Sequence, residues 1–79
     1  MQIQGIWKYN NTQMVVAQFE DALMGNWLTD GGWFAKGSIS NNSVKMLFQD
    51  STGYNDTQTG TVSSDGKSIK WSNSTTWTR

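Results

Sequence analysis

The chain has 79 residues, with six basic and six acidic side chains and a formal net charge of zero. It contains no cysteine and no histidine, which excludes disulfides and thiol chemistry and removes the commonest general base and metal ligand at neutral pH. The length predicts one domain over residues 1–79. The cations are scattered and no apolar run approaches the roughly 20 residues of a membrane helix, so we expect neither nucleic acid nor a membrane as a partner. No signal-peptide pattern is visible, and the compartment is left open, with the cytoplasm as the default expectation.

Turn signals interrupt the chain every few residues, and β-forming residues dominate between them. We predict strands near 3–9, 14–20, 22–28, 33–39, 44–49, 57–62, 68–72 and 76–79. Asn-Asn, Asp-Gly and Gly-Gly pairs in the connections supply the positive φ that tight hairpins need. The stretch from Met14 to Leu28 also permits a short helix, because glycine is absent from most of it, but Val15, Ala17 and Phe19 alternate as in a strand.

One hairpin pattern occurs twice in the chain. The segment Gly37-Ser-Ile-Ser, a turn and Ser43-Val-Lys-Met matches Gly60-Thr-Val-Ser, a turn and Ser68-Ile-Lys-Trp. The apolar residue has the same phase in both copies, so we expect Ile39 to face Val44, and Val62 to face Ile69, across their hairpins. The echo indicates a meander assembled from hairpins, since two copies are too few for a solenoid.

Strand phase predicts the residues of an inner face, with lysines and glutamines on the opposite phase. This inner face comprises Ile3, Trp7, Tyr9, Val15, Ala17, Phe19, Trp33, Ala35, Ile39, Val44, Met46, Phe48, Ile69 and Trp71. Eight short strands, each followed by its neighbour, close into a barrel that leaves no exposed edge. At eight strands the interior is just wide enough for side chains or one small ligand. We therefore predict an all-β fold, an antiparallel up-and-down meander of about eight strands that forms a minimal closed barrel.

The first predicted strand carries Gly5-Ile6-Trp7, and the last ends in Trp77-Thr78-Arg79. This pairing resembles the calycins, the superfamily of lipocalins, fatty-acid-binding proteins and avidins. The resemblance implies a barrel in which Trp7 lies at the closed end and Arg79 packs over its ring as a structural lock. A guanidinium over an indole contributes about 0.5–2 kcal/mol, and the first and last strands of a closed barrel are neighbours. The resemblance also implies a small apolar or amphipathic ligand inside the barrel.

The residues show no catalytic constellation. The acids are Glu20, Asp21, Asp30, Asp50, Asp56 and Asp65, and most of them sit beside turn residues, where a carboxylate caps backbone amides. No histidine is present to activate a serine, and the G-x-S-x-G and S-x-x-K patterns are absent. Oxygen-bearing residues between positions 50 and 56 lack the spacing of a calcium loop. We expect no enzyme activity, no metal and no cofactor.

The tryptophans leave three hypotheses open. In the first, Met24, Trp27, Trp33 and Phe34 line the barrel mouth and hold a small apolar or amphipathic ligand. In the second, Asp30, Trp33, Asn73 and Trp77 bind a carbohydrate, with indoles stacking on the sugar and polar neighbours bonding its hydroxyls. In the third, the aromatic residues serve only the core or an interface between copies, because a thin core needs such support. We expect a homo-oligomer whose function is to bind a small-molecule or glycan ligand without catalysis.

Overall fold

The computed structural model describes residues 1–28 and 32–79, and these residues form eight strands and no helix. The strands are β1 (Gly5–Tyr9), β2 (Thr12–Phe19), β3 (Ala22–Trp27), β4 (Phe34–Ser40), β5 (Ser43–Gln49), β6 (Asn55–Val62), β7 (Ser68–Trp71) and β8 (Thr76–Thr78). Membrane-spanning helices are accordingly absent from the described part of the chain. The stretch for which a helix was the alternative consists of β2 and β3.

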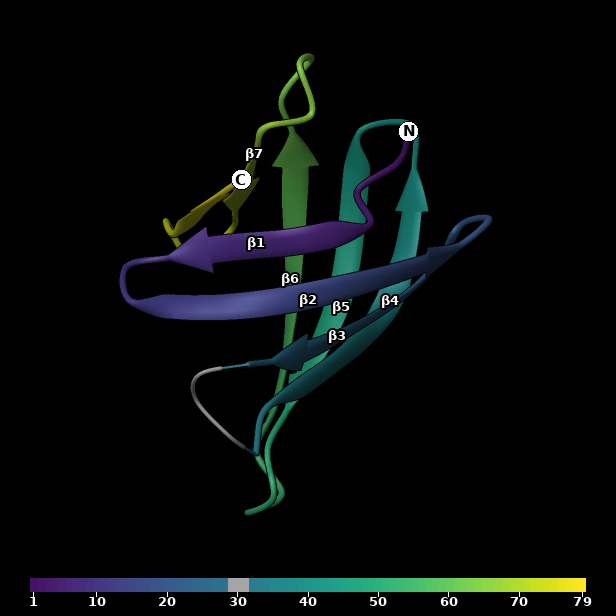
Figure 1. The fold of residues 1–79 in the computed structure, drawn as a ribbon. Helices are drawn as coiled ribbons and strands as arrows, with labels where there is room; N and C mark the ends of the chain where they lie inside the picture. Colours follow the sequence, from purple (N-terminus) through teal and green to yellow (C-terminus); the bar gives the residue numbers. More distant parts are fainter. Residues whose placement is uncertain (29–31) are drawn as a thin grey trace.

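Each strand pairs antiparallel with the next, and β8 returns to pair with β1, which closes the sheet into a barrel. In Figure 1, β1 and β2 run roughly horizontally, whereas β5 and β6 run vertically. Strands on opposite walls of a small barrel cross in this way because every strand is tilted against the barrel axis. The predicted all-β meander and its closure are therefore confirmed.

Tight turns fix the register of the hairpins. Asn10 and Asn41, each the first residue of a two-residue connection, have φ of 52° and 54°, a conformation that asparagine tolerates well. Ile39 pairs with Val44 in β4–β5, and Val62 pairs with Ile69 in β6–β7. Both predicted cross-strand pairs are confirmed, which shows that the repeated pattern in the sequence reports equivalent hairpins.

Two equivalent glycines of the repeated pattern allow the strands to approach closely. A Cβ atom added to Gly37 would lie 1.9 Å from the backbone oxygen of Lys45. A Cβ atom on Gly60 would lie 2.9 Å from the Cε3 atom of Trp71 and from the Cγ2 atom of Ile69. Glycine is required at both positions because any side chain would push the adjoining strand or ring away.

The core fills the barrel with side chains from all eight strands and from the segment before β1. Its buried members are Ile3, Trp7, Met14, Val16, Leu23, Ala35, Ile39, Val44, Met46, Phe48, Val62, Ile69, Trp71 and Trp77. Trp7, Leu23 and Ile69 are among the residues with almost no exposed surface. Burial of this apolar surface is the main stabilising contribution to a domain of this size.

The predicted inner face of β2 was wrong by one residue. Met14 and Val16 point into the barrel, whereas Ala17 is exposed and Phe19 is 77% exposed. The cause is the short turn after β1, which places Met14 directly opposite the buried Trp7. A shift of one residue in register moves every side chain of a strand to the other face.

Arg79 closes one end of the barrel. Its Cζ atom lies 4.4 Å from the centroid of the Trp7 ring. Its Nε, Nη1 and Nη2 atoms donate hydrogen bonds to the backbone oxygens of Gly66, Gln4 and Gln2 at 2.8, 2.9 and 3.0 Å. Both termini and the β6–β7 loop lie at this end, and the β5–β6 connection lies at the other (Figure 1). Arg79 therefore caps only one of the two ends, and the other is called the open end.

Candidate functional site

A cavity of about 350 Å³ lies at the open end of the barrel. Apolar side chains line one part of it, and hydroxyl, amide and carboxylate groups line the rest. The lining residues are Tyr9, Thr12, Met14, Trp27, Trp33, Phe48, Tyr54, Asp56, Gln58, Trp71, Asn73, Thr75 and Trp77. They lie far apart in the sequence and meet only because the barrel closes.

The aromatic residues of the cavity form a continuous cluster. Phe48, Trp71 and Trp77 are buried, and their ring centroids lie 4.8 to 5.9 Å apart. Trp27 lies 5.8 Å from Trp77 and 6.2 Å from Trp33, centroid to centroid, and both Trp27 and Trp33 are half-buried. The buried rings belong to the core, whereas the half-buried ones leave aromatic surface available to a ligand.

The aromatic rings meet at steep angles. Tyr54 stands 75° from Trp33 at a centroid distance of 5.5 Å, and Trp27 stands 87° from Phe48 at 5.7 Å. Edge-to-face contact of this kind is the arrangement that aromatic quadrupoles favour. The rings therefore form a cup with walls in several directions, and not one flat platform.

A chain of hydrogen bonds runs from Ser72, the residue after β7, to Gln58 and Asp56 on the polar side of the cavity. The Ser72 hydroxyl donates to Gln58 Oε1, and Gln58 Nε2 donates to Asp56 Oδ2 at 2.6 Å. The backbone N–H of Thr59 donates to Ser72 Oγ at 3.3 Å. Asp56 pairs with Phe48 across β5–β6, so alternation along β6 turns both Asp56 and Gln58 toward the interior.

Asp56 is the one charged side chain among the described residues that line the cavity. Its carboxylate is half-buried and accepts a hydrogen bond from an uncharged amide. No described lysine or arginine lines the cavity with it. The site thus combines aromatic rings with one negative charge that no cation of the lining compensates.

Trp71 contributes a buried polar group without a partner. Its side chain is 3% exposed, and its Nε1 atom has no hydrogen-bond partner among the described residues. The Cε3 edge of the ring faces Gly60, so Nε1, on the other edge of the indole, faces away from that strand. A buried donor left unpaired costs about 1–3 kcal/mol.

The tight β7–β8 connection positions the last cavity residues. Asn73 Oδ1 accepts hydrogen bonds from the backbone N–H and the hydroxyl of Thr75 at 3.1 and 2.6 Å. Ser74, between them, has a φ of 72°. This local network holds Thr75 and Trp77 at the rim, since asparagine side chains stabilise turns by bonding the backbone two residues ahead.

The structure brings together only some of the residues that the sequence singled out for a ligand. Trp27 and Trp33 line the cavity, but Met24 and Phe34 lie on the outer surface, where they are 63% and 43% exposed. Both have the phase opposite to the inward-facing Ala35, and Met24 pairs with Lys36 on the outer face. Two of the four residues of the first ligand hypothesis, Trp27 and Trp33, therefore lie in the cavity, and the other two do not.

The residues predicted to bind a carbohydrate converge on the same place. Trp33, Asn73 and Trp77 all line the cavity, and Asp30 lies outside the described residues. The sequence reasoning missed Asp56, because the strand was expected to begin at 57, and it missed Gln58, which lay inside the predicted strand but was not assigned to the inner face. The alternation of Asp56, Gln58, Gly60 and Val62 is the signal that would have placed them on the inner face.

Two other acidic side chains in described turns, Asp50 and Asp65, have structural roles. Asp50 Oδ1 accepts hydrogen bonds from the Thr52 hydroxyl and from the backbone N–H groups of Thr52 and Tyr54. These bonds, the Thr52 hydroxyl first, lower the pKa of Asp50 below its ordinary value. The Ser63 hydroxyl, followed by the backbone N–H of Lys67, lowers the pKa of Asp65 in the same way. Within the described residues, no group of three potential ligand side chains is placed to hold a metal ion.

A second hollow, of about 520 Å³, lies over the strands from β4 to β7. Serine and threonine residues, together with Lys45 and Lys70, make up most of its lining. Most of these side chains have the outward phase of their strands. It therefore lacks the aromatic enclosure that distinguishes the cavity at the open end.

Comparison with protein-family models, curated proteins and solved structures finds no match to this chain. The fold and the cavity are therefore interpreted from the residues of this chain alone.

Proposed function

We propose that the protein binds a small amphipathic ligand, without catalysis, in the cavity at the open end of a calycin-like barrel. The observation that carries the proposal is a cavity wall that combines the half-buried rings of Trp27 and Trp33 with the inward-facing Asp56. An aromatic wall with a few convergent polar groups is the usual composition of a small-molecule site. The cavity thus offers apolar surface and a carboxylate within one enclosure.

The aromatic surface alone supports binding of moderate strength. Trp27 and Trp33 remain half-buried although they pack against the core. A ligand that removes about 100 Å² of apolar surface from water gains about 2.5 kcal/mol before entropic costs. Polar contacts to Asp56 would add to this gain and fix the orientation of the ligand.

The calycin part of the proposal is supported by the opposite end of the barrel. Gly5 and Trp7 begin the first strand, and Arg79 packs on the Trp7 ring at 4.4 Å. A barrel closed at this end admits a ligand only from the other one. The described cavity lies there, as the calycin arrangement requires.

A carbohydrate is the second candidate ligand. Trp33, Asn73 and Trp77 line one cavity although they are separated by about half of the chain. Asn73 uses its Oδ1 atom within the turn, which leaves its amide nitrogen for a sugar hydroxyl. Stacking on an indole and hydrogen bonds from amides are the contacts that a sugar ring accepts.

Native mass spectrometry and tryptophan fluorescence test the proposal together. Protein purified without denaturation is expected to carry added mass, or to show quenching or enhancement with a neutral probe such as N-phenylnaphthylamine. Trp33→Ala should abolish the signal, because Trp33 lines the cavity. Phe34→Ala is the matched control, since the neighbouring ring lies on the outer surface. Equal loss in both variants, or no ligand by either method, would refute binding at this cavity.

A further inference from the structure

We infer that the ligand of this cavity is a small organic cation with an alkylated ammonium group. The inference rests on the proposed function, because it concerns the chemical class of the ligand at that same site. Asp56 and the aromatic cup of Trp27, Trp33 and Tyr54 carry it.

The described lining of the cavity carries one negative charge, on Asp56. Asp56 receives its described hydrogen bond from the Gln58 amide, which supplies a donor but no positive charge. A neutral ligand that covers a half-buried carboxylate removes its water and leaves the charge uncompensated. A cation replaces that water with an opposite charge, so closure of the site over Asp56 favours a cationic ligand.

The aromatic rings act in the same direction. The face of an aromatic ring carries partial negative charge, and alkylated ammonium groups are bound by cups of such rings. Trp33 and Tyr54 meet at 75°, and Trp27 is tilted 39° from Trp33. Rings in several orientations suit a round ammonium group, whereas a flat sugar ring is better matched by a single exposed face.

The charge and the rings together define the ligand class as an alkylated ammonium compound. Choline is a simple probe of this class.

The decisive comparison uses choline and its uncharged isostere dimethylbutanol, in which carbon replaces the quaternary nitrogen. Binding to the full chain is followed by tryptophan fluorescence and by amide shifts in NMR. Choline is expected to bind about tenfold more tightly than the isostere, as desolvated cation–π and carboxylate contacts allow. Asp56→Asn keeps an acceptor for Gln58 and should remove most of this preference.

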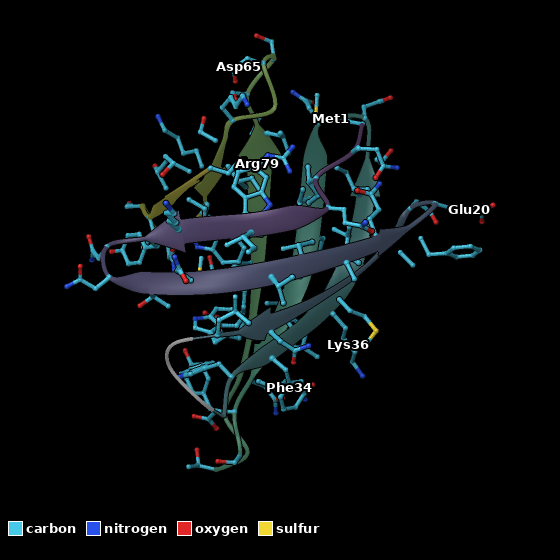
Figure 2. The ribbon with its side chains drawn as sticks, viewed as in Figure 1. Met1, Glu20, Phe34, Lys36, Asp65 and Arg79 are labelled. Atoms are coloured by element: carbon cyan, nitrogen blue, oxygen red, sulfur yellow. The ribbon has the colours of Figure 1, made fainter. Side chains whose placement is uncertain are left out.

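Glu20→Gln is the matched control, because it removes one negative charge from an exposed turn between β2 and β3 (Figure 2). This variant should keep the preference for choline. Thermal unfolding of both variants checks that they are folded.

The outcomes separate the two proposals. Equal or tighter binding of dimethylbutanol, or an Asp56→Asn variant that keeps the full preference, overturns the inference. The same holds if a neutral sugar binds and choline does not. If the neutral probe N-phenylnaphthylamine still binds and Trp33→Ala abolishes its binding, the proposed function stands while the cation is refuted. Absence of every ligand, the neutral probe included, refutes both.

Discussion

Removal of the Arg79 side chain tests how the barrel is closed. In Arg79→Met the chain loses a guanidinium 4.4 Å from the Trp7 centroid and hydrogen bonds to the carbonyls of Gly66, Gln4 and Gln2. A cation–π contact at an exposed site contributes about 0.5–1 kcal/mol. Each exposed hydrogen bond contributes about 0.5–1 kcal/mol after competition with water. The free energy of unfolding should therefore fall by about 2–4 kcal/mol.

Urea unfolding followed by tryptophan fluorescence measures this loss. Arg79→Lys should recover less than half of it, because one ammonium group cannot reach three carbonyls on separate segments. Lys70→Met, at an exposed position of β7, should change the free energy by less than about 0.5 kcal/mol. A loss of less than about 1 kcal/mol in Arg79→Met would show that the first and last strands are held together by their backbone pairing and core contacts alone.

Four further substitutions test the turns and close contacts. Gly60→Ala places a Cβ atom 2.9 Å from the Trp71 ring and should lower the free energy of unfolding by about 1–3 kcal/mol in urea unfolding. In Gly25→Ala the new Cβ atom meets other atoms only at 3.6 Å or beyond, so the free energy should change by less than about 1 kcal/mol. Equal effects of the two substitutions would contradict the close-contact argument. Glu20 has a φ of 55°, so Glu20→Gly should raise the free energy of unfolding by about 0.5–1 kcal/mol, and a lower melting temperature would refute strain there. The lowered pKa of Asp50 stabilises the fold above the ordinary carboxyl pKa, and this contribution disappears as the pH falls through the lowered value. The melting temperature of Asp50→Asn should therefore depend less on pH in the acid range than that of the parent protein. Parallel pH profiles of the two proteins would argue against a stabilising role of the Asp50 carboxylate.

The hairpins were predictable because local and cross-strand signals agree there. Between Gly37 and Met46 apolar residues occupy one phase and polar residues the other, and a two-residue turn joins the strands. The same holds around Val62 and Ile69. Such segments specify their register without knowledge of the rest of the fold.

The phase of β2 was not predictable from its own residues. Met14, Val15, Val16 and Ala17 are apolar on both faces, so periodicity does not distinguish inside from outside. The decision comes from β1, where the buried Trp7 lies opposite Met14. A pairing partner outside the segment thus determines which of two equivalent faces is buried.

The candidate site required the closed barrel. Trp33 and Trp77 were recognisable as aromatic residues near turns, but nothing local connects them with Asp56. Strand alternation turns Asp56 inward, and closure then places it in the lining with both rings. Individual candidates were therefore accessible to sequence reasoning, whereas their combination depends on long-range topology.

Polar and charged groups are paired differently at the two ends of the barrel. At the closed end the buried Trp7 donates from Nε1 to the Ile3 oxygen at 2.8 Å, and the guanidinium of Arg79 finds three carbonyls. At the open end the equally buried Trp71 Nε1 has no described partner, and the charge of Asp56 meets no described cation in the cavity. Stability alone would favour satisfied groups at both ends. Because such exceptions gather at sites that bind ligands, their position at one end is the reason to look for the proposed ligand there.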